Sequence, residues 1–115
     1  MIYLFTGQPG TGKTTKAREL QSKLGCPWFD GDDIRSGLSS GLGYNSEDRH
    51  ENVRRVFEIC KILDAQGFDV IVSMVAPLVR SRNLFVAEFL CNYTETFCGT
   101  VYEKRPDNYY AEYER

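Results

Sequence analysis

The chain has 115 residues, of which 42% are hydrophobic and 26% charged, a composition typical of a single folded domain, which we predict to span residues 1–115. The formal net charge of −2 provides no global field that would attract nucleic acid or an anionic membrane surface, so we expect neither as a partner. The apolar N-terminal run has only six residues before Gly7, which is too short for a signal peptide or a membrane span and predicts a cytoplasmic protein.

The first predicted element is a buried strand over residues 2–6, a short run of β-branched and aromatic residues that stops at Gly7. A helix is predicted to follow from Gly12 and to end at Gly25. Its buried face is predicted to carry Ala17, Leu20 and Leu24. The order of elements is therefore strand, glycine-rich loop and helix.

A second short strand is predicted around residues 26–30, ending at a group of aspartates. The next helix is predicted to begin with Ser46 as its N-cap and with Glu47 and Asp48 in its first turn, where negative charge suits the helix dipole. Gly67 is predicted to end it. Its buried face is predicted to carry Val53, Val56, Phe57, Cys60 and Leu63.

Residues 68–75 form the clearest predicted strand, which ends before Pro77. A helix is predicted to follow, with its inward face made by Leu84, Ala87, Leu90 and Cys91. Residues 95–103 predict a last strand, and the polar, tyrosine-rich residues 104–115 predict a C-terminal tail or lid. Alternating strands and helices favour a three-layer α/β fold, with helices on both faces of a mostly parallel sheet.

Cysteine and histidine are too dispersed to suggest a metal site. The only histidine is His50, which we predict to be structural, and no two cysteines form a CxxC pair. We expect neither a zinc site nor a disulfide framework. All four cysteines are predicted to be buried thiols: Cys26, Cys60, Cys91 and Cys98.

The strongest motif is GQPGTGKT, Gly7 to Thr14, which fits the GxxxxGK[ST] phosphate loop at every fixed position. Its glycines let backbone N–H groups and a helix N-terminus surround phosphate oxygens. Lys13 is predicted to reach the β- and γ-phosphates of ATP, and the Thr14 hydroxyl to ligate Mg²⁺. The predicted ATP-binding residues are Gly7, Gln8, Pro9, Gly10, Thr11, Gly12, Lys13, Thr14 and Thr15.

A phosphate loop is shared by kinases, GTPases, motors and nucleotide-gated switches. The sequence has no NKxD or DxxG pattern of a GTPase and is too short for motor modules. A small-molecule kinase becomes the leading class, because such enzymes place acidic residues where the strand beside the phosphate loop ends. The motif DGDD, residues 30–33, follows the predicted second strand.

The order of motifs, a phosphate loop followed by DGDDIR, LGYNSEDRHENVRR and DVIVSMVAP, resembles the adenylylsulfate kinase family. The resemblance covers residues 1–82. It implies a phosphate-loop kinase fold and a role in sulfate assimilation. The implied reaction moves the γ-phosphate of ATP, with Mg²⁺, to the 3′-hydroxyl of adenosine 5′-phosphosulfate and gives its 3′-phosphorylated product, PAPS.

The resemblance also implies roles for individual residues. Asp32 matches the aspartate that assists deprotonation of the acceptor hydroxyl and organises magnesium, with Asp30 as its neighbour, and Lys13 completes the catalytic set. An arginine offers N–H donors to phosphate or sulfate, and an aromatic ring offers a stacking surface for the adenine. The implied substrate-binding residues are Arg35, Tyr44, Arg49 and Asn52.

Several positions depart from the family pattern. Ala76 replaces a serine that can carry phosphate in the family, so a phosphoenzyme route through it is excluded. Asp33 replaces a common asparagine and is expected to add a negative charge beside the substrate. Val79 replaces a nearby arginine, although Arg82 retains a later one. The chain is also too short for the family's basic lid after residue 95, which makes a homodimer possible. The alternatives are a kinase for a nucleoside, a sugar or a polynucleotide end, and a nucleotide-binding protein without catalysis.

Overall fold

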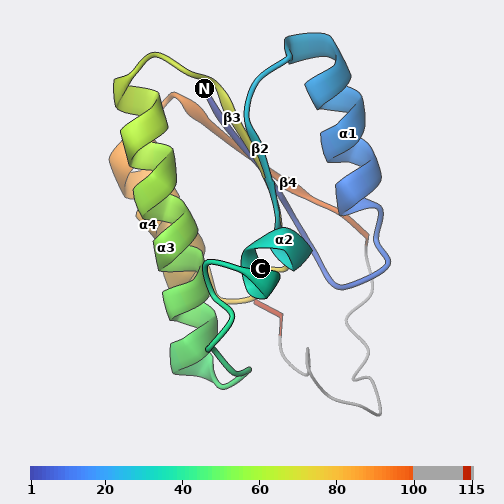
Figure 1. Ribbon diagram of the computed structural model, residues 1–115, viewed down its shortest axis with the longest axis vertical. Helices are drawn as coiled ribbons and strands as arrows, with labels where there is room; N and C mark the ends of the chain where they lie inside the picture. The colour runs from blue at the N-terminus through green and yellow to red at the C-terminus, as the bar shows by residue number, and fades with distance from the viewer. Residues whose placement is uncertain (100–112, 115) are drawn as a thin grey trace.

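The computed structural model describes residues 1–99 and 113–114, which form a sheet between two layers of helices. Within that part of the chain the elements are β1 (Ile2–Thr6), α1 (Lys13–Leu24), β2 (Trp28–Asp30), α2 (Gly31–Ser36), α3 (Ser46–Ala65), β3 (Val70–Ser73), α4 (Val79–Phe89) and β4 (Tyr93–Phe97). The described strands are all parallel, in the order β2-β3-β1-β4. Figure 1 shows α1 on one face of the sheet and α3 with α4 on the other. The predicted three-layer α/β fold is confirmed.

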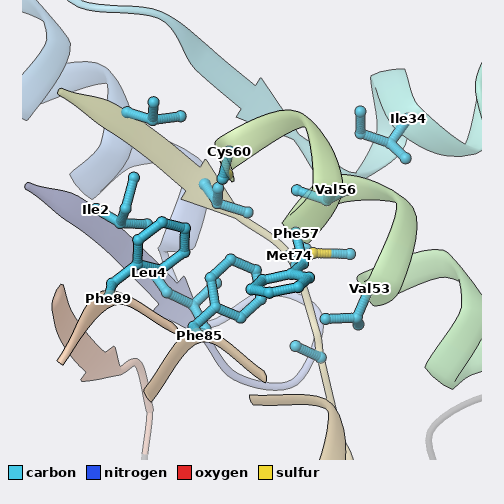
Figure 2. Close-up of a cluster of buried hydrophobic side chains, with 13 residues drawn as sticks. Ile2, Leu4, Ile34, Val53, Val56, Phe57, Cys60, Met74, Phe85 and Phe89 are labelled. Carbon is cyan, nitrogen blue, oxygen red and sulfur yellow. The ribbon is translucent and has the colours of Figure 1, made fainter. Parts of the chain in front are cut away.

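The main hydrophobic core lies between the sheet and the helices α3 and α4 (Figure 2). Its centre is an aromatic group in which the Phe57 ring lies 5.4 Å from that of Phe85 and 5.9 Å from that of Phe89, measured between ring centroids. The β1 residues Ile2 and Leu4 pack against this group from the sheet. Every residue of β3 is buried, as expected for a strand covered by helices on both faces.

The inward face of α4 differs from the prediction. Phe85 and Phe89 point into the core, whereas Ala87, Leu90 and Cys91 are exposed and Leu90 retains 74% of its accessible surface. Phe85 and Phe89 are four residues apart and therefore share one face of the helix. The predicted Leu84 is half-buried and packs against the core, so the prediction is wrong for the other three residues, because it was based on aliphatic and small side chains and omitted the phenylalanines.

The N-cap of α3 is Asn45, one residue before the predicted Ser46. The Asn45 side chain accepts a hydrogen bond from the Asp48 backbone N–H at 2.8 Å. Asparagine and serine are both good N-caps, and the extended backbone of Asn45 leaves it just outside the first turn. The helix ends at Ala65, close to Gly67 as predicted, and the first helix likewise ends before Gly25.

Burial of the other predicted inward residues is mixed. In α1 only Ala17 is fully buried, whereas Leu20 is half-buried and Leu24 is exposed. Cys60 and Cys98 are buried as predicted, and burial raises the pKa of the Cys60 thiol to about 12. Cys26 is half-buried and Cys91 is exposed, so the prediction is wrong for the latter.

The predicted last strand is found as β4, although residues 100–103 of the predicted range lie outside the described part of the chain. The predicted tail or lid over 104–115 also lies outside it, apart from Tyr113 and Glu114. None of the helices in the described ranges combines the length and apolar character that crossing a membrane requires.

Candidate active site

The phosphate loop connects the end of β1 to the first turn of α1 (Figure 1). Gly10 and Gly12 have positive φ angles of 77° and 89°, and Gly12 is the N-cap of α1. A Cβ on Gly7 would collide with the backbone carbonyl oxygen of Cys98, so no larger residue fits there. The loop therefore adopts its fold through backbone conformations that only glycine takes easily.

Lys13 lies within this loop and is half-buried. Its Nζ donates a hydrogen bond to the Gln8 carbonyl oxygen at 2.9 Å. Burial lowers the pKa of Lys13, while interactions with Cys98, Asp30 and Asp32 act in the opposite direction. The site thus holds a partly desolvated cation close to two carboxylates.

Asp30 ends β2 and is the N-cap of α2. Its Oδ1 accepts hydrogen bonds from Thr14 Oγ1 at 3.0 Å and from Ser73 Oγ at 2.6 Å. Its Oδ2 accepts a longer one from the Asp32 backbone N–H at 3.4 Å. Asp30, and not Asp32, is therefore the carboxylate in contact with Thr14.

Asp32 and Asp33 are both exposed in the first turn of α2, but only Asp32 lines the main cavity. The expectation that Asp33 places its charge beside the substrate is wrong, because Asp33 does not line the cavity. The difference arises because successive residues of a helix point in directions about 100° apart. Asp33 is then a surface residue of α2.

The arginine and aromatic residues from the second motif form a connected group. The Arg35 guanidinium donates to the backbone oxygens of Leu42 and Gly43 at 3.1 and 2.8 Å, and lies 4.4 Å from the centre of the Tyr44 ring. Arg49 Nε donates to the Tyr44 backbone oxygen at 2.6 Å. Both arginines therefore shape the segment that carries Tyr44.

Asn52 lies in the next turn of α3 and retains 7% of its accessible surface. Its Oδ1 is buried and has no hydrogen-bond partner among the described residues. An unpaired buried acceptor costs free energy, which a donor from a bound ligand would recover. Asn52 is therefore a candidate for accepting a hydrogen bond from an N–H or O–H group of a bound ligand.

One cavity of about 200 Å³ brings these groups together. From the predicted site it is lined by Pro9, Gly10, Lys13, Thr14, Asp30, Asp32, Arg35, Tyr44, Arg49 and Asn52. A neighbouring hollow is lined by Gly10, Gly12, Lys13, Thr14 and Thr15. Gly7, Gln8 and Thr11 line neither and instead shape the loop, as the hydrogen bond from Thr11 Oγ1 to the Gln8 carbonyl oxygen at 2.6 Å shows.

The cavity also has a wall that sequence reasoning missed, made by Ser73 and by residues 74–77. Ala76 in this wall has a φ of 41° and is buried. Arg82 retains 2% of its surface and donates from Nη1 to the Ala76 carbonyl oxygen at 2.6 Å. Arg82 thus supports the wall from behind and does not line the cavity.

The described end of the chain reaches the same wall. Arg82 Nη2 donates to the Glu114 backbone oxygen, and the Glu114 backbone N–H donates to the Pro77 carbonyl oxygen at 2.8 Å. The Tyr113 hydroxyl lies 2.6 Å from Thr6 Oγ1, next to the phosphate loop. No local sequence pattern signals these contacts, because they join residues that lie more than 30 positions apart.

Comparisons with known proteins identify the family of this chain. The adenylylsulphate kinase family profile matches residues 1–111. Adenylyl-sulfate kinases of Clostridium acetobutylicum and Pseudomonas aeruginosa are 43% and 45% identical over 71% and 72% of this chain, which covers 44% and 45% of their own lengths. The chain thus spans less than half the length of these relatives.

Among solved structures, the fold is similar to that of the Mycobacterium tuberculosis APS kinase CysC in complex with AMPPNP and APS. The TM-score is 0.75 and the identity 33%, over 87% of this chain and 62% of that one. Because the family profile matches nearly the whole chain, the protein belongs to the adenylylsulfate kinase family.

Proposed function

We propose that the protein is a kinase that transfers the γ-phosphate of ATP to the 3′-hydroxyl of adenosine 5′-phosphosulfate and forms PAPS. The observation that carries the proposal is the single cavity in which the phosphate-loop residues Lys13 and Thr14 face Asp32, Arg35 and Asn52. The related Mycobacterium tuberculosis enzyme, solved with both an ATP analogue and APS, supports the same pair of ligands here.

The proposed ATP site is the phosphate loop and the N-terminus of α1. Its backbone N–H groups and the positive end of the helix dipole favour phosphate oxygens. Lys13 exchanges its contact with the Gln8 carbonyl oxygen for the β- and γ-phosphates. This places positive charge where negative charge increases during transfer.

Magnesium fits the donor groups at this site. Mg²⁺ prefers oxygen ligands and is usually held by one or two carboxylates together with substrate phosphates and water. Thr14 supplies a hydroxyl and Asp30 and Asp32 supply carboxylates on the same cavity wall. We assign Thr14 and Asp32 as its protein ligands, with Asp30 orienting Thr14. The bound ion would neutralise phosphate charge during transfer.

The proposed acceptor site is the remainder of the cavity. Tyr44 would stack on the adenine, Arg35 and Arg49 would hold the phosphosulfate, and the buried Asn52 Oδ1 would accept a hydrogen bond from the substrate. Asp32 accepts the proton of the 3′-hydroxyl as its oxygen attacks the γ-phosphorus. The bond between the γ-phosphorus and the β,γ-bridging oxygen breaks, and ADP leaves.

The proposal is tested by ADP release from MgATP with and without adenosine 5′-phosphosulfate. Release that depends on this substrate supports the proposal. Release only with another hydroxyl compound, such as a nucleoside, a sugar or a polynucleotide end, would identify a different kinase. Binding of ATP without turnover would identify a nucleotide-binding protein.

Asp32 is tested by Asp32→Ala, with Asp33→Ala as the matched control on the same turn of α2. Loss of a positioned base lowers turnover by roughly 100- to 10,000-fold. Asp33→Ala should retain wild-type turnover, because Asp33 does not line the cavity. Near wild-type turnover by Asp32→Ala would refute its assignment as the base.

We further propose one domain over residues 1–115, a cytoplasmic location where ATP is available, and a homo-oligomer of which a dimer is the simplest form. A relative from Thiobacillus denitrificans, 31% identical with a TM-score of 0.73 over 86% of this chain and 22% of that one, is described as a hexameric APS kinase. Light scattering of the purified protein measures its oligomeric state. A monomer at all concentrations would contradict this part of the proposal.

A further inference from the structure

A chain of hydrogen bonds leads from Trp28 to the phosphate loop. The Trp28 indole Nε1 donates to Ser73 Oγ at 2.9 Å, and Ser73 Oγ donates to Asp30 Oδ1 at 2.6 Å. Thr14 Oγ1 donates to the same Oδ1 at 3.0 Å. Side chains from β2, β3 and α1 therefore converge on one carboxylate oxygen.

Strand register places these groups together. In the parallel ladder of β2 and β3, Asp30 pairs with Ser73, and Trp28 pairs with Ile71. Residues two apart on a strand share a face, so Trp28 and Asp30 lie on the same face of the sheet as Ser73. This is the face that α1 covers (Figure 1), and the Arg18 guanidinium of α1 lies 6.0 Å from the centre of the Trp28 ring.

In this series of hydrogen bonds, the chemistry of the groups determines which atom donates and which accepts. An indole N–H can only donate, so Ser73 Oγ accepts from Trp28 and is left with its own proton to give to Asp30. An ionised carboxylate can only accept a hydrogen bond, so the Thr14 hydroxyl must also donate its proton to Asp30. Only the lone pairs of the Thr14 hydroxyl then remain for the cavity that Thr14 lines.

We propose that Trp28 and Ser73 are positioning residues that hold the Asp30 carboxylate so that the Thr14 hydroxyl presents its lone pairs to a nucleotide-bound cation. Without the Trp28 N–H, the Ser73 hydroxyl is free to rotate away from Asp30. Without Ser73, the Asp30 Oδ1 loses its shorter hydrogen bond and Thr14 loses its fixed acceptor. Groups that orient metal ligands from behind commonly change metal affinity by about 10- to 100-fold.

This inference rests on the proposed function, because a cation enters the site only with a nucleotide. The competing explanation is purely structural, since the same hydrogen bonds also tie β2 to β3. The two explanations differ in what a variant loses. A positioning role affects the gain in ATP affinity that Mg²⁺ brings, whereas a structural role affects ATP affinity equally with and without Mg²⁺.

The test is isothermal titration calorimetry of ATP in MgCl₂ and in EDTA, for wild type, Ser73→Ala and Ser39→Ala. Ser39 is the matched control because it is also a buried serine, and its Oγ has no hydrogen-bond partner among the described residues. In Ser73→Ala the ratio of the ATP Kd in EDTA to that in MgCl₂ should fall by about 10-fold. In Ser39→Ala the ratio should stay at the wild-type value.

Trp28→Phe is the second variant, since it keeps an aromatic ring and removes only the N–H donor. It should lower the same ratio, by less than Ser73→Ala does, and it keeps the inference testable if Ser73→Ala does not fold. A wild-type ratio in both variants, or an equal loss of ATP affinity in both media, would overturn the inference and leave the proposed function standing. Absence of ATP binding by wild type in either medium would overturn both.

Discussion

At the scale of one residue, the partly buried charge of Lys13 lowers the stability of the folded protein. Burial lowers its pKa, so the folded protein holds this charge less readily than the unfolded chain does. Stability therefore rises as the pH increases through the folded pKa toward 10.5, because the folded state releases the proton first. In the proposed function, Lys13 uses this charge to hold the β- and γ-phosphates of ATP.

We expect Lys13→Met to unfold at a higher urea concentration than wild type at neutral pH, because the variant no longer buries a charge. The difference should shrink at alkaline pH. ATP affinity should fall by about 10- to 100-fold, the cost of a lost hydrogen bond to a charged group. A variant that is less stable than wild type at neutral pH would contradict this account of Lys13.

His50 provides the second prediction at this scale. Its Nδ1 lies 2.7 Å from Ser81 Oγ and joins α3 to α4, and burial together with the Arg80 charge lowers the pKa of His50 below 6.5, with Glu51 opposing. As the pH falls, the unfolded chain takes up the proton first. The contribution of His50 to stability is therefore fully present above pH 6.5 and is lost as the pH falls through the folded pKa.

Thermal unfolding at about pH 7.5 and about pH 5.5 tests this sign, because the lower value lies below the ordinary pKa of histidine. The fall in Tm should be larger for wild type than for His50→Gln, which cannot titrate. An identical fall in both proteins would show that His50 does not contribute.

Individual site residues were predictable only where a motif fixes them. The phosphate loop is continuous in sequence, so Lys13 and Thr14 could be assigned from it directly. The contact between Thr14 and Asp30 depends on how α1 sits against β2 and is not a property of either motif. For the same reason sequence reasoning overlooked Ser73 and Trp28, which become part of the site only through strand pairing.

At the scale of elements, the N-terminus of α4 is stabilised by a contact with Glu114. The Val79 backbone N–H donates to Glu114 Oε1 at 2.8 Å, and the helix has no side-chain cap of its own. A carboxylate at this position satisfies an open N–H group and interacts favourably with the helix dipole.

We expect Glu114→Ala to destabilise the fold by about 0.5 to 1 kcal/mol, and so to lower Tm by a few degrees. Glu88→Ala is the control, because Glu88 is an exposed residue at the other end of α4. Differential scanning calorimetry measures both. An equal Tm for Glu114→Ala and wild type would show that the contact does not stabilise the helix.

The packing of α4 against α3 depends on its aromatic face. Phe85 is fully buried between Phe57 and Phe89 (Figure 2), so Phe85→Ala should cost about 3 to 5 kcal/mol. That is a large part of the roughly 5 to 15 kcal/mol typical of a domain. Val86→Ala, at a half-exposed neighbour, should change stability by about 0.5 kcal/mol or less. A loss below about 1 kcal/mol in urea unfolding of Phe85→Ala would contradict the predicted importance of this core.

Elements were predictable from sequence where hydrophobic runs and glycine stops are unambiguous. The run at 68–75 and the stop signals Gly25 and Gly67 located β3 and the ends of two helices. On α4 the prediction holds in part for Leu84, which packs against the core, and is wrong for Ala87, Leu90 and Cys91. The full burial of Phe85 depends on its partners across the core, which the local sequence does not show.

At the scale of the whole molecule, the sheet order explains why distant motifs share one cavity. Parallel strands direct their carboxyl ends to the same edge of the sheet, where ligands bind in open α/β folds. The phosphate loop follows the carboxyl end of β1, Asp30 and Asp32 lie where β2 passes into α2, and the wall over 73–77 begins at the carboxyl end of β3. A parallel sheet was predictable from the alternation of elements, whereas the order β2-β3-β1-β4 was not, because strand pairing is set by long-range contacts.

The central claim is that this cavity joins an ATP site to an acceptor site. Incubation with [γ-³²P]ATP, Mg²⁺ and adenosine 5′-phosphosulfate, followed by chromatography of the products, tests it most directly. The account predicts label in the 3′-phosphorylated product, with transfer lost in Asp32→Ala and kept in Asp33→Ala. Label confined to ATP and inorganic phosphate in the presence of adenosine 5′-phosphosulfate would contradict it.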